Sequence, residues 1–219
     1  MASIIAGRLD DLPPVILERL GAFRYRVFVQ RLQWEIPGLP RNATSEWDEF
    51  DATPTVHLIA LSSCGEVCGC ARLMPTTGPN LLSDVFPQLC APREPPSSPS
   101  IWELSRFAGT GMPNARLGAS SGMSLFPYAM ALAQSMGATC VVGVLTRSVA
   151  RLYRRFGLDL RDMGIPTAAG DGEIVACSID LSAAAFHRLQ CDPATLLNSI
   201  IRVGQISQLE AMGGAPEPD

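Results

Sequence analysis

Apolar residues recur along this chain with two different periods, and these periods predict its helices and strands. Near the N-terminus, large apolar side chains recur every three or four residues from Ile16 to Val27, which predicts an amphipathic helix beginning near Asp10. Elsewhere, short apolar and β-branched runs bounded by Gly, Pro or Ser are typical of strands. The expected strands are 55–61, 67–73, 101–107, 138–145 and 173–181. The expected later helices are 120–136, 147–156 and one beginning near Ser182.

The order of these elements predicts an α/β fold with three α/β/α layers and a mixed central sheet. At 219 residues and 47% hydrophobic content the chain can bury one complete core, so we expect a single domain over residues 1–211. Residues 212–219, MGGAPEPD, predict a disordered tail.

Charge and hydropathy argue against two classes of partner. The net charge of −4 gives no general attraction to nucleic acid or to an anionic membrane. No apolar run reaches the roughly 18 residues that a membrane-spanning helix needs. The N-terminal apolar stretch is too short, and its acidic pair too early, for a signal peptide. We therefore expect a cytoplasmic protein.

Seven cysteines raise the question of a metal site or a disulfide framework. Their number is odd, and Cys68-Gly-Cys70 lacks the two-residue spacer of a zinc knuckle. Only His57 and His187 could complete a site. We expect no metal, and we interpret the thiols as small buried apolar groups.

The segment IWELSRF, residues 101–107, combines an acid, a hydroxyl and a guanidinium in an apolar strand. Strict alternation would place Glu103, Ser105 and Phe107 on one face and Arg106 on the other. Glu103 and Arg106 can serve one site only if the strand carries a bulge or the arginine reaches around an edge. The alternative is a structural, partly buried Glu–Arg ion pair.

Two further segments have unusual charge patterns. Residues 35–54 have a loop-like composition and include EWDEFD, residues 46–51, which is either a solvated acidic loop or a lid for a cationic ligand. The helix 147–156 has four arginines opposite its apolar side, namely Arg147, Arg151, Arg154 and Arg155. They form either an ordinary exposed face or a docking patch for a phosphate or an acidic carrier.

Nine residues in order give the chain a family resemblance. They are Arg24, Phe28 and Trp34 near the end of the first helix, the pair Asp48 and Asp51, then Arg72, Phe86, Glu103 and Arg106. In this pattern, over roughly residues 10–190, the chain resembles the acyl-homoserine-lactone synthases of the autoinducer synthase family. The resemblance implies a GNAT-like fold, with a V-shaped cleft where two central strands splay around the acyl donor.

The resemblance also implies a reaction. Such enzymes join S-adenosylmethionine to a fatty acyl thioester, on acyl carrier protein or coenzyme A, and release methylthioadenosine. S-adenosylmethionine is then a consumed substrate, so no cofactor is expected, and we expect a monomer. Glu103 is the expected general base, with Arg72 and Arg106 as further catalytic residues.

The resemblance extends to substrate binding. Arg24, Asp48, Asp51, Arg72, Glu103 and Arg106 are expected to form a cluster of alternating charge that holds the N-terminal lid. Phe28 and Trp34 would enclose the sulfonium or adenosyl group. Phe86, Ser105 and Phe107 complete the expected substrate-binding set.

Gly143 lies in the run that would line the acyl tunnel, where relatives that make 3-oxo products carry threonine. Glycine there predicts an unsubstituted acyl chain, because no hydroxyl is present to pair with a C3 carbonyl. It also predicts a chain of medium length, because glycine leaves room. The alternative is that Gly143 only permits close packing between a helix and a strand.

Two other function classes remain open. A GNAT enzyme that uses acetyl-CoA on another amine would carry the pyrophosphate loop spelled by Arg106-Phe-Ala-Gly109-Thr-Gly111. The residues that follow, 112–114, argue against it, because a helix should begin there to bind the phosphates. A binding module without catalysis has no reason to bury a glutamate in a central strand.

Overall fold

The computed structural model describes residues 3–110, 122–170 and 172–206. Within these ranges nine strands form a mixed sheet in the order β6-β8-β5-β4-β3-β2-β1-β9, with β7 paired to β8. The strands are β1 Ser3–Gly7, β2 Val56–Leu61, β3 Val67–Pro75, β4 Ile101–Gly109, β5 Cys140–Thr146, β6 Leu160–Asp162, β7 Thr167–Ala169, β8 Gly172–Asp180 and β9 Ile200–Arg202. The pairs β4–β5 and β1–β9 are parallel, and the other pairs are antiparallel.

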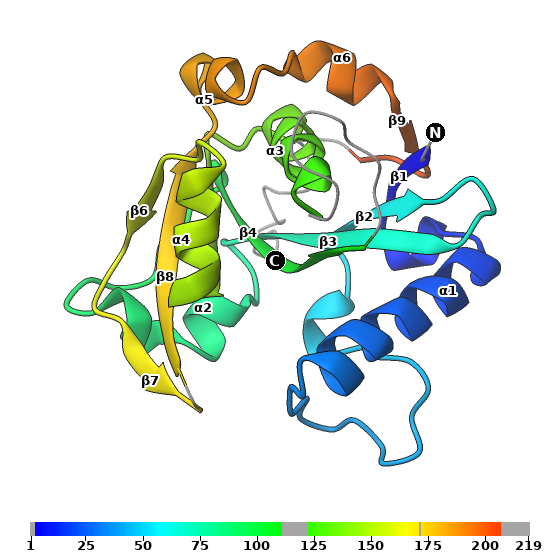
Figure 1. The fold of residues 1–219 in the computed structure, drawn as a ribbon, viewed down its shortest axis with the longest axis horizontal. Helices are drawn as coiled ribbons and strands as arrows, with labels where there is room; N and C mark the ends of the chain where they lie inside the picture. The colour runs from blue at the N-terminus through cyan, green and yellow to red at the C-terminus, as the bar shows by residue number, and fades with distance from the viewer. Residues whose placement is uncertain (1–2, 111–121, 171, 207–219) are drawn as a thin grey trace, which may run out of the picture.

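Helices cover both faces of the sheet, which confirms the three-layer prediction. They are α1 Pro14–Arg24, α2 Leu81–Asp84, α3 Phe126–Ser135, α4 Arg147–Arg155, α5 Ala183–Arg188 and α6 Pro193–Asn198. Figure 1 shows α1 and α3 on opposite sides of β2 and β3. The apolar residues of α3 and α4 pack on one face, whereas those of α1 and α2 pack on the other, which we call the α1 face.

The two central strands part soon after they meet. β4 and β5 pair over three positions only, from Ile101 opposite Cys140 to Glu103 opposite Val142. β4 then continues beside β3, and β5 continues beside β8. The splayed strands confirm the predicted V-shaped arrangement and place Glu103 at its apex.

A β-bulge interrupts β4 just beyond the apex. Arg72 pairs with Ser105, but Cys70 pairs with Ala108, so β4 has one residue more than β3 between these positions. Arg106 adopts a left-handed backbone with a φ of 47°, and the Cys70 thiol donates to its carbonyl oxygen at 3.1 Å. The strict alternation is therefore wrong at Arg106 and Phe107, and the bulge that a shared site requires is present.

Several elements were not predicted. β1 and β9 lie at the two ends of the described chain and pair with each other, and α6 packs against α3 (Figure 1). The first helix begins at Pro14 rather than near Asp10 and continues as a π-helical turn, Tyr25–Arg31. The predicted tail, 212–219, lies outside the described residues. No helix in the described ranges is long and apolar enough to cross a membrane.

Candidate active site

Three arginines from separate elements meet on the α1 face. Arg24 ends α1, Arg72 lies in the middle of β3, and Arg106 is the bulged residue of β4. All three side chains are buried, and Arg72 is fully inaccessible. Arg24 is therefore part of the protein interior and not of a solvated helix face. Three buried cations require acidic partners, because an unpaired charge in the interior is very costly.

The acidic loop between α1 and β2 supplies these partners. Glu46 accepts hydrogen bonds from Nε of Arg24 at 2.6 Å and from Nη2 of Arg106 at 2.9 Å. Asp51 binds Nη1 and Nη2 of Arg24 at 2.7 and 2.9 Å, and Nη1 of Arg72 at 3.0 Å. Asp48 bridges Arg72 and Nη2 of Arg106, the latter at 2.6 Å. We call these six residues the ion cluster.

Local structure fixes the acids in place. Asp48 caps the 3-10 turn Glu49–Asp51, and Asp51 returns the bond by accepting from the Asp48 backbone N–H at 2.8 Å. The backbone N–H of Glu46 donates to the carbonyl of Gly21 in α1 at 3.0 Å. The loop is thus a lid held on the sheet by ion pairs, and a freely solvated acidic loop is excluded.

The pairing sets the protonation states of the ion cluster. Burial alone would raise the pKa values of Glu46 and Asp51, but the neighbouring guanidinium groups hold both below their usual range. Burial likewise disfavours the charged form of Arg24, yet Asp51 and Glu46 raise its pKa. Glu46, Asp51 and Arg24 are therefore all charged near neutral pH.

Glu103 does not belong to the ion cluster, contrary to prediction. Glu46 takes the expected place of Glu103 beside Arg24 and Arg106. In the described chain no arginine lies within ion-pair distance of Glu103. Its Oε2 accepts from the Leu82 backbone N–H at 3.0 Å, and its Oε1 has no hydrogen-bond partner among the described residues. Burial raises the pKa of Glu103 to about 7.

Other polar groups of the α1 face surround Glu103 and Arg72. Nε of Arg72 donates to Oγ of Ser105 at 2.8 Å, while its Nη2 has no partner among the described residues. His57 pairs with Arg72 in the sheet register, and its Nε2 lies 3.7 Å from Oδ1 of Asp51. Burial lowers the pKa of His57 to about 3, so the imidazole is neutral.

The predicted aromatic pair is present but already covers a cation of the protein. The rings of Phe28 and Trp34 stack with centroids 4.9 Å apart. The guanidinium of Arg106 lies 5.5 Å from each ring centroid. Phe28 is fully buried, whereas Trp34 is exposed. Arg106 therefore already contacts both rings, and of the two Trp34 keeps an accessible surface for a substrate.

The cleft between β4 and β5 is apolar on the α3 face. Phe107 points there and packs edge-on against Phe126 and Tyr153, at centroid distances of 5.3 and 6.1 Å. These rings line a cavity of about 30 Å³ together with Gly143. A Cβ built on Gly143 would lie only 2.7 Å from the carbonyl oxygen of Leu104. Gly143 thus lines the cleft and also permits a close approach, between two strands rather than a helix and a strand.

Phe86 lies apart from this cavity. It packs, half-buried, against the apolar group formed by α2, the following turn and β5, on the α1 face beyond Glu103. The structure therefore brings Phe86 to the Glu103 side of the cleft and Phe107 to the opposite side.

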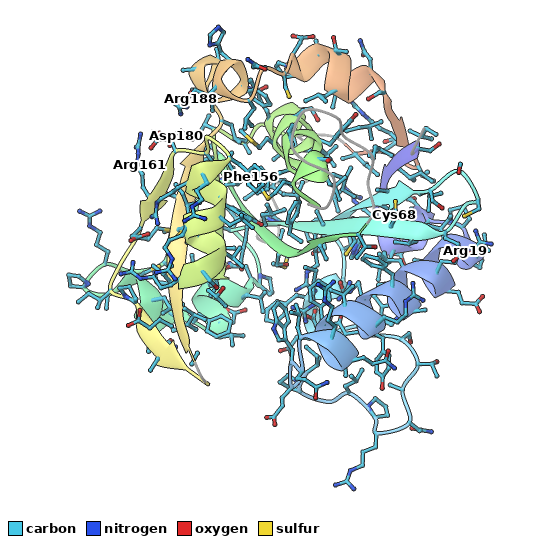
Figure 2. The ribbon with its side chains drawn as sticks, viewed as in Figure 1. Arg19, Cys68, Phe156, Arg161, Asp180 and Arg188 are labelled. Atoms are coloured by element: carbon cyan, nitrogen blue, oxygen red, sulfur yellow. The ribbon has the colours of Figure 1, made fainter. Side chains whose placement is uncertain are left out.

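The arginines of α4 divide into two kinds. Arg154 binds Asp162 at 2.6 Å, and Arg147 lies 3.3 Å from Asp162 and 3.6 Å from Glu173. Arg151 and Arg155 are exposed and form no ion pair in the described residues. Figure 2 shows the neighbouring Arg161 and Asp180 beside α4, another ion pair, at 2.9 Å. The sequence concealed these partners because they come from β6 and β8.

Metal ligation has no support in the described part of the chain. No group of three His, Cys, Asp or Glu side chains there could hold a metal ion. Cys70, Cys90 and Cys177 are buried, as expected, but Cys64 is exposed at the tip of the β2–β3 hairpin. The segment from Arg106 to Gly109 belongs to β4, and Arg106 binds Glu46 and Asp48. Residues 106–109 therefore form a strand rather than a phosphate-binding loop, while Gly111 and residues 112–114 lie outside the described ranges.

Sequence reasoning missed Glu46 as a member of the site. Its signal was present, because Glu46 begins the same acidic run as Asp48 and Asp51. Alternation along an extended segment places residues 46 and 48 on one side, so both can face the same arginines.

Comparison with known proteins agrees with this arrangement. A sequence model of the autoinducer synthase family matches residues 14–189. An acyl-homoserine-lactone synthase of Pseudomonas aeruginosa is 36% identical over 178 residues, which are 81% of this chain and 86% of the relative. The crystal structure of TofI in a ternary complex with an inhibitor and MTA has a TM-score of 0.75 and 38% identity, covering 88% of this chain and 98% of TofI.

A second solved structure extends the likeness to nearly the whole chain. The structure of BjaI, a CoA-dependent acyl-homoserine lactone synthase, with SAM and isopentyl-CoA has a TM-score of 0.78 and 25% identity. It covers 97% of this chain and 98% of BjaI. These neighbours confirm the GNAT-like fold predicted from the resemblance. The chain belongs to the autoinducer synthase family and is an acyl-homoserine-lactone synthase.

Proposed function

We propose that this synthase transfers an unsubstituted, medium-chain fatty acyl group to the α-amine of S-adenosylmethionine, with Glu103 as the general base. The state of Glu103 supports the base assignment. Its carboxylate is buried at the apex of the cleft, one oxygen is held by Leu82, and Oε1 has no partner in the described chain. S-adenosylmethionine is then consumed as a substrate.

The amine needs a base before it can react. With a reference pKa of about 7.7–8.0, an α-amine is mostly ammonium at pH 7 and cannot attack a thioester. A carboxylate whose pKa is about 7 accepts a proton far better at this pH than an ordinary glutamate. Oε1 of Glu103, directly or through a water molecule, is the proposed acceptor of that proton.

The free amine then attacks the thioester carbonyl. The C–N bond forms and the C–S bond breaks. Of the two protons that the nitrogen loses on the way from ammonium to amide, the one held by Glu103 passes to the departing thiolate and the second is released to solvent. The tetrahedral oxyanion requires donors, for which we propose backbone N–H groups near residues 104–106. Beyond Glu103, β4 pairs with β3 but no longer with β5, so backbone groups directed toward β5 lie outside the ladder.

Lactone closure completes the reaction. The methionyl carboxylate attacks its own γ-carbon and expels methylthioadenosine as a neutral thioether. The sulfonium is already a good leaving group, so this step chiefly needs the correct folding of the substrate. We propose that Nη2 of Arg72, buried and unpartnered in the described residues, binds this carboxylate beside Glu103.

The ion cluster has a positioning role in this proposal. Arg24, Asp48 and Asp51 hold the lid, and Arg106 ties the lid to the bulge of β4. Ser105 orients Arg72 through its hydroxyl. Phe28 supports Arg106, while the exposed surface of Trp34 is the proposed contact for the adenosyl group.

The acyl chain is proposed to enter the apolar cleft on the α3 face. Phe107 and Gly143 line it among mostly apolar side chains, together with the ring of Tyr153. The present cavity has the volume of about one water molecule. An acyl chain must therefore displace the side chains that line it. Phe86 is proposed to contact the donor from the Glu103 side.

The donor is proposed to be carried by acyl carrier protein or by coenzyme A. Arg151 and Arg155, exposed and unpaired in the described chain, favour an acidic carrier. A cytoplasmic location, a monomeric state and a single domain remain predictions.

Purified protein tests this function directly. S-adenosylmethionine is supplied with octanoyl carrier protein or with octanoyl-CoA, and methylthioadenosine is measured together with N-octanoyl homoserine lactone. Both products should form in equal amounts with at least one donor. An acyltransferase that requires another amine would form neither product from this mixture, and that result would contradict the proposal.

A further inference from the structure

Asn80, which no part of the mechanism above uses, is buried beside the site. It is the N-cap of α2, and its Oδ1 accepts from the Ser83 backbone N–H at 3.0 Å. Its Nδ2 donates to the Gly78 carbonyl at 2.9 Å. Asparagine is mostly a surface residue, so an almost inaccessible Asn80 with both ends of its amide bonded indicates a fixed local structure.

The turn that Asn80 holds carries the donor to Glu103. Leu82 follows Asn80 by two residues, and its backbone N–H meets Oε2 of Glu103 at 3.0 Å. Without the cap, the backbone N–H groups at the start of α2 lose their fixed direction. The side chain of Leu82 is fully buried, which fixes the other end of the same turn.

We infer that Asn80 is a positioning residue that acts through Leu82 to fix the carboxylate of Glu103 and to set its basicity. The hydrogen bond from Leu82 occupies Oε2, which leaves Oε1 as the reactive oxygen. A donor to a carboxylate stabilises the charged form. This inference deepens the proposed function and rests on Glu103 as the base.

Other groups around Glu103 act on the same equilibrium. Burial is the largest influence and raises the pKa, while the backbone of Leu82, the positive charge of Arg72 on β3 and the backbone of Leu81 lower it. Asp84 of α2 raises it, and Cys90 on the following turn is a neutral neighbour whose pKa is itself raised. Of these influences, those of the Leu81 and Leu82 backbone depend on the turn that Asn80 caps.

The test compares variants that lose or keep the cap. Asn80→Ala removes the acceptor for Ser83, whereas Asn80→Ser keeps one, because serine is a good N-cap. Ser182→Ala is the matched control, since Ser182 caps α5 with the same type of bond to Ala185 on another part of the fold. If Asn80→Ala does not fold, Asn80→Gly replaces it, because glycine at an N-cap costs less stability than alanine.

The readout is the pH profile of kcat/KM, followed by methylthioadenosine release, from pH 6 to 9. Loss of a donor to a charged group is worth about one pKa unit. In Asn80→Ala, the pKa that governs the fall of kcat/KM on the acid side of the profile (the acid limb) should therefore rise by about one pH unit. This lowers kcat/KM about tenfold at pH 6 and little at pH 9. The ionisation of the substrate amine is identical in all variants. Asn80→Ser and Ser182→Ala should keep the wild-type limb.

A direct titration separates this inference from the proposed function. The carboxyl carbon of Glu103 is followed by NMR in protein labelled with 13C-glutamate and is assigned by its absence in Glu103→Gln. A higher pKa in Asn80→Ala than in the wild type supports the inference, even if Glu103 proves not to be the base. An unchanged pKa, or an equal fall in kcat/KM at every pH, overturns it. A wild-type rate that does not follow the Glu103 titration contradicts the base assignment instead.

Discussion

Ser105 and Arg106 are consecutive residues of β4, yet both side chains reach the same ion cluster. Ser105 accepts a hydrogen bond from Nε of Arg72, and Arg106 binds Asp48, which also binds Arg72. In a regular strand these neighbours would face opposite sides of the sheet. The bulge brings them together, and it sends Phe107 to the acyl side. The extra residue of the bulge thus directs Arg106 to the ion cluster and Phe107 to the proposed acyl cleft on the opposite face.

The ion cluster should respond strongly to the loss of one member. Glu46→Ala removes the carboxylate that Arg24 and Arg106 share and leaves three buried arginines with two acidic partners, so one buried positive charge is uncompensated. We therefore expect a loss of about 3–5 kcal/mol in the free energy of unfolding. Glu49→Ala, in the same loop but exposed, is the control and should change it by less than about 0.5 kcal/mol. Urea unfolding measures both. Equal stability of the two variants would show that Glu46 is not required to hold the lid.

Stability between pH 5 and 6.5 should be nearly flat, because two buried groups oppose each other. His57, with a folded pKa of about 3, is protonated below about pH 6.5 only when unfolded, so it contributes less stability as the pH falls. Glu103, with a folded pKa of about 7 against 4.5, keeps its proton only when folded, so its contribution is lost as the pH rises. Each slope is at most about 1.4 kcal/mol per pH unit.

Two variants separate these slopes in urea unfolding at pH 5 and 6.5. His57→Gln should become less stable as the pH rises, and Glu103→Gln should become more stable. Parallel pH dependence in the two variants would contradict the assigned protonation states.

Much of the fold could be predicted from the sequence, because the apolar repeat that marks α1, β2 to β5, α4 and β8 lies within each element itself. The end strands β1 and β9 were missed because each is short and its pairing joins distant segments. The ion cluster was predicted through the family resemblance rather than by periodicity. The sequence named Glu103 as a cluster member, whereas the structure has Glu46 in that place. This difference arises from the directions of the side chains, which spacing alone does not determine.

Carrier docking should depend on the two unpaired arginines of α4. The double variant Arg151→Glu and Arg155→Glu should raise the KM for octanoyl carrier protein about tenfold at low salt, and weaken its salt dependence. Arg202→Glu, on the opposite edge strand, is the control. The KM for octanoyl-CoA should change much less. An equal rise for both donors would place the effect in the cleft rather than in docking.

Gly143 should determine the preference at C3 of the acyl chain. Offered octanoyl and 3-oxo-octanoyl donors in competition, the wild type should prefer octanoyl, because position 143 offers no hydroxyl to the C3 oxygen. Gly143→Ala and Gly143→Thr both meet the Leu104 carbonyl, so both should lose turnover. The threonine variant should use the oxo donor about tenfold better than the alanine variant, relative to octanoyl. Equal use of the two donors by the wild type would contradict this role.

The central claim is that Glu103 activates the amine of S-adenosylmethionine for acylation. Its most direct test is the rate of methylthioadenosine and N-octanoyl homoserine lactone formation at pH 7.5 by the wild type and Glu103→Gln. Circular dichroism and urea unfolding first establish that the variant is folded. A general base contributes about two to four orders of magnitude, so the variant should lose that much in both products. Near wild-type turnover by the folded variant would place the base elsewhere.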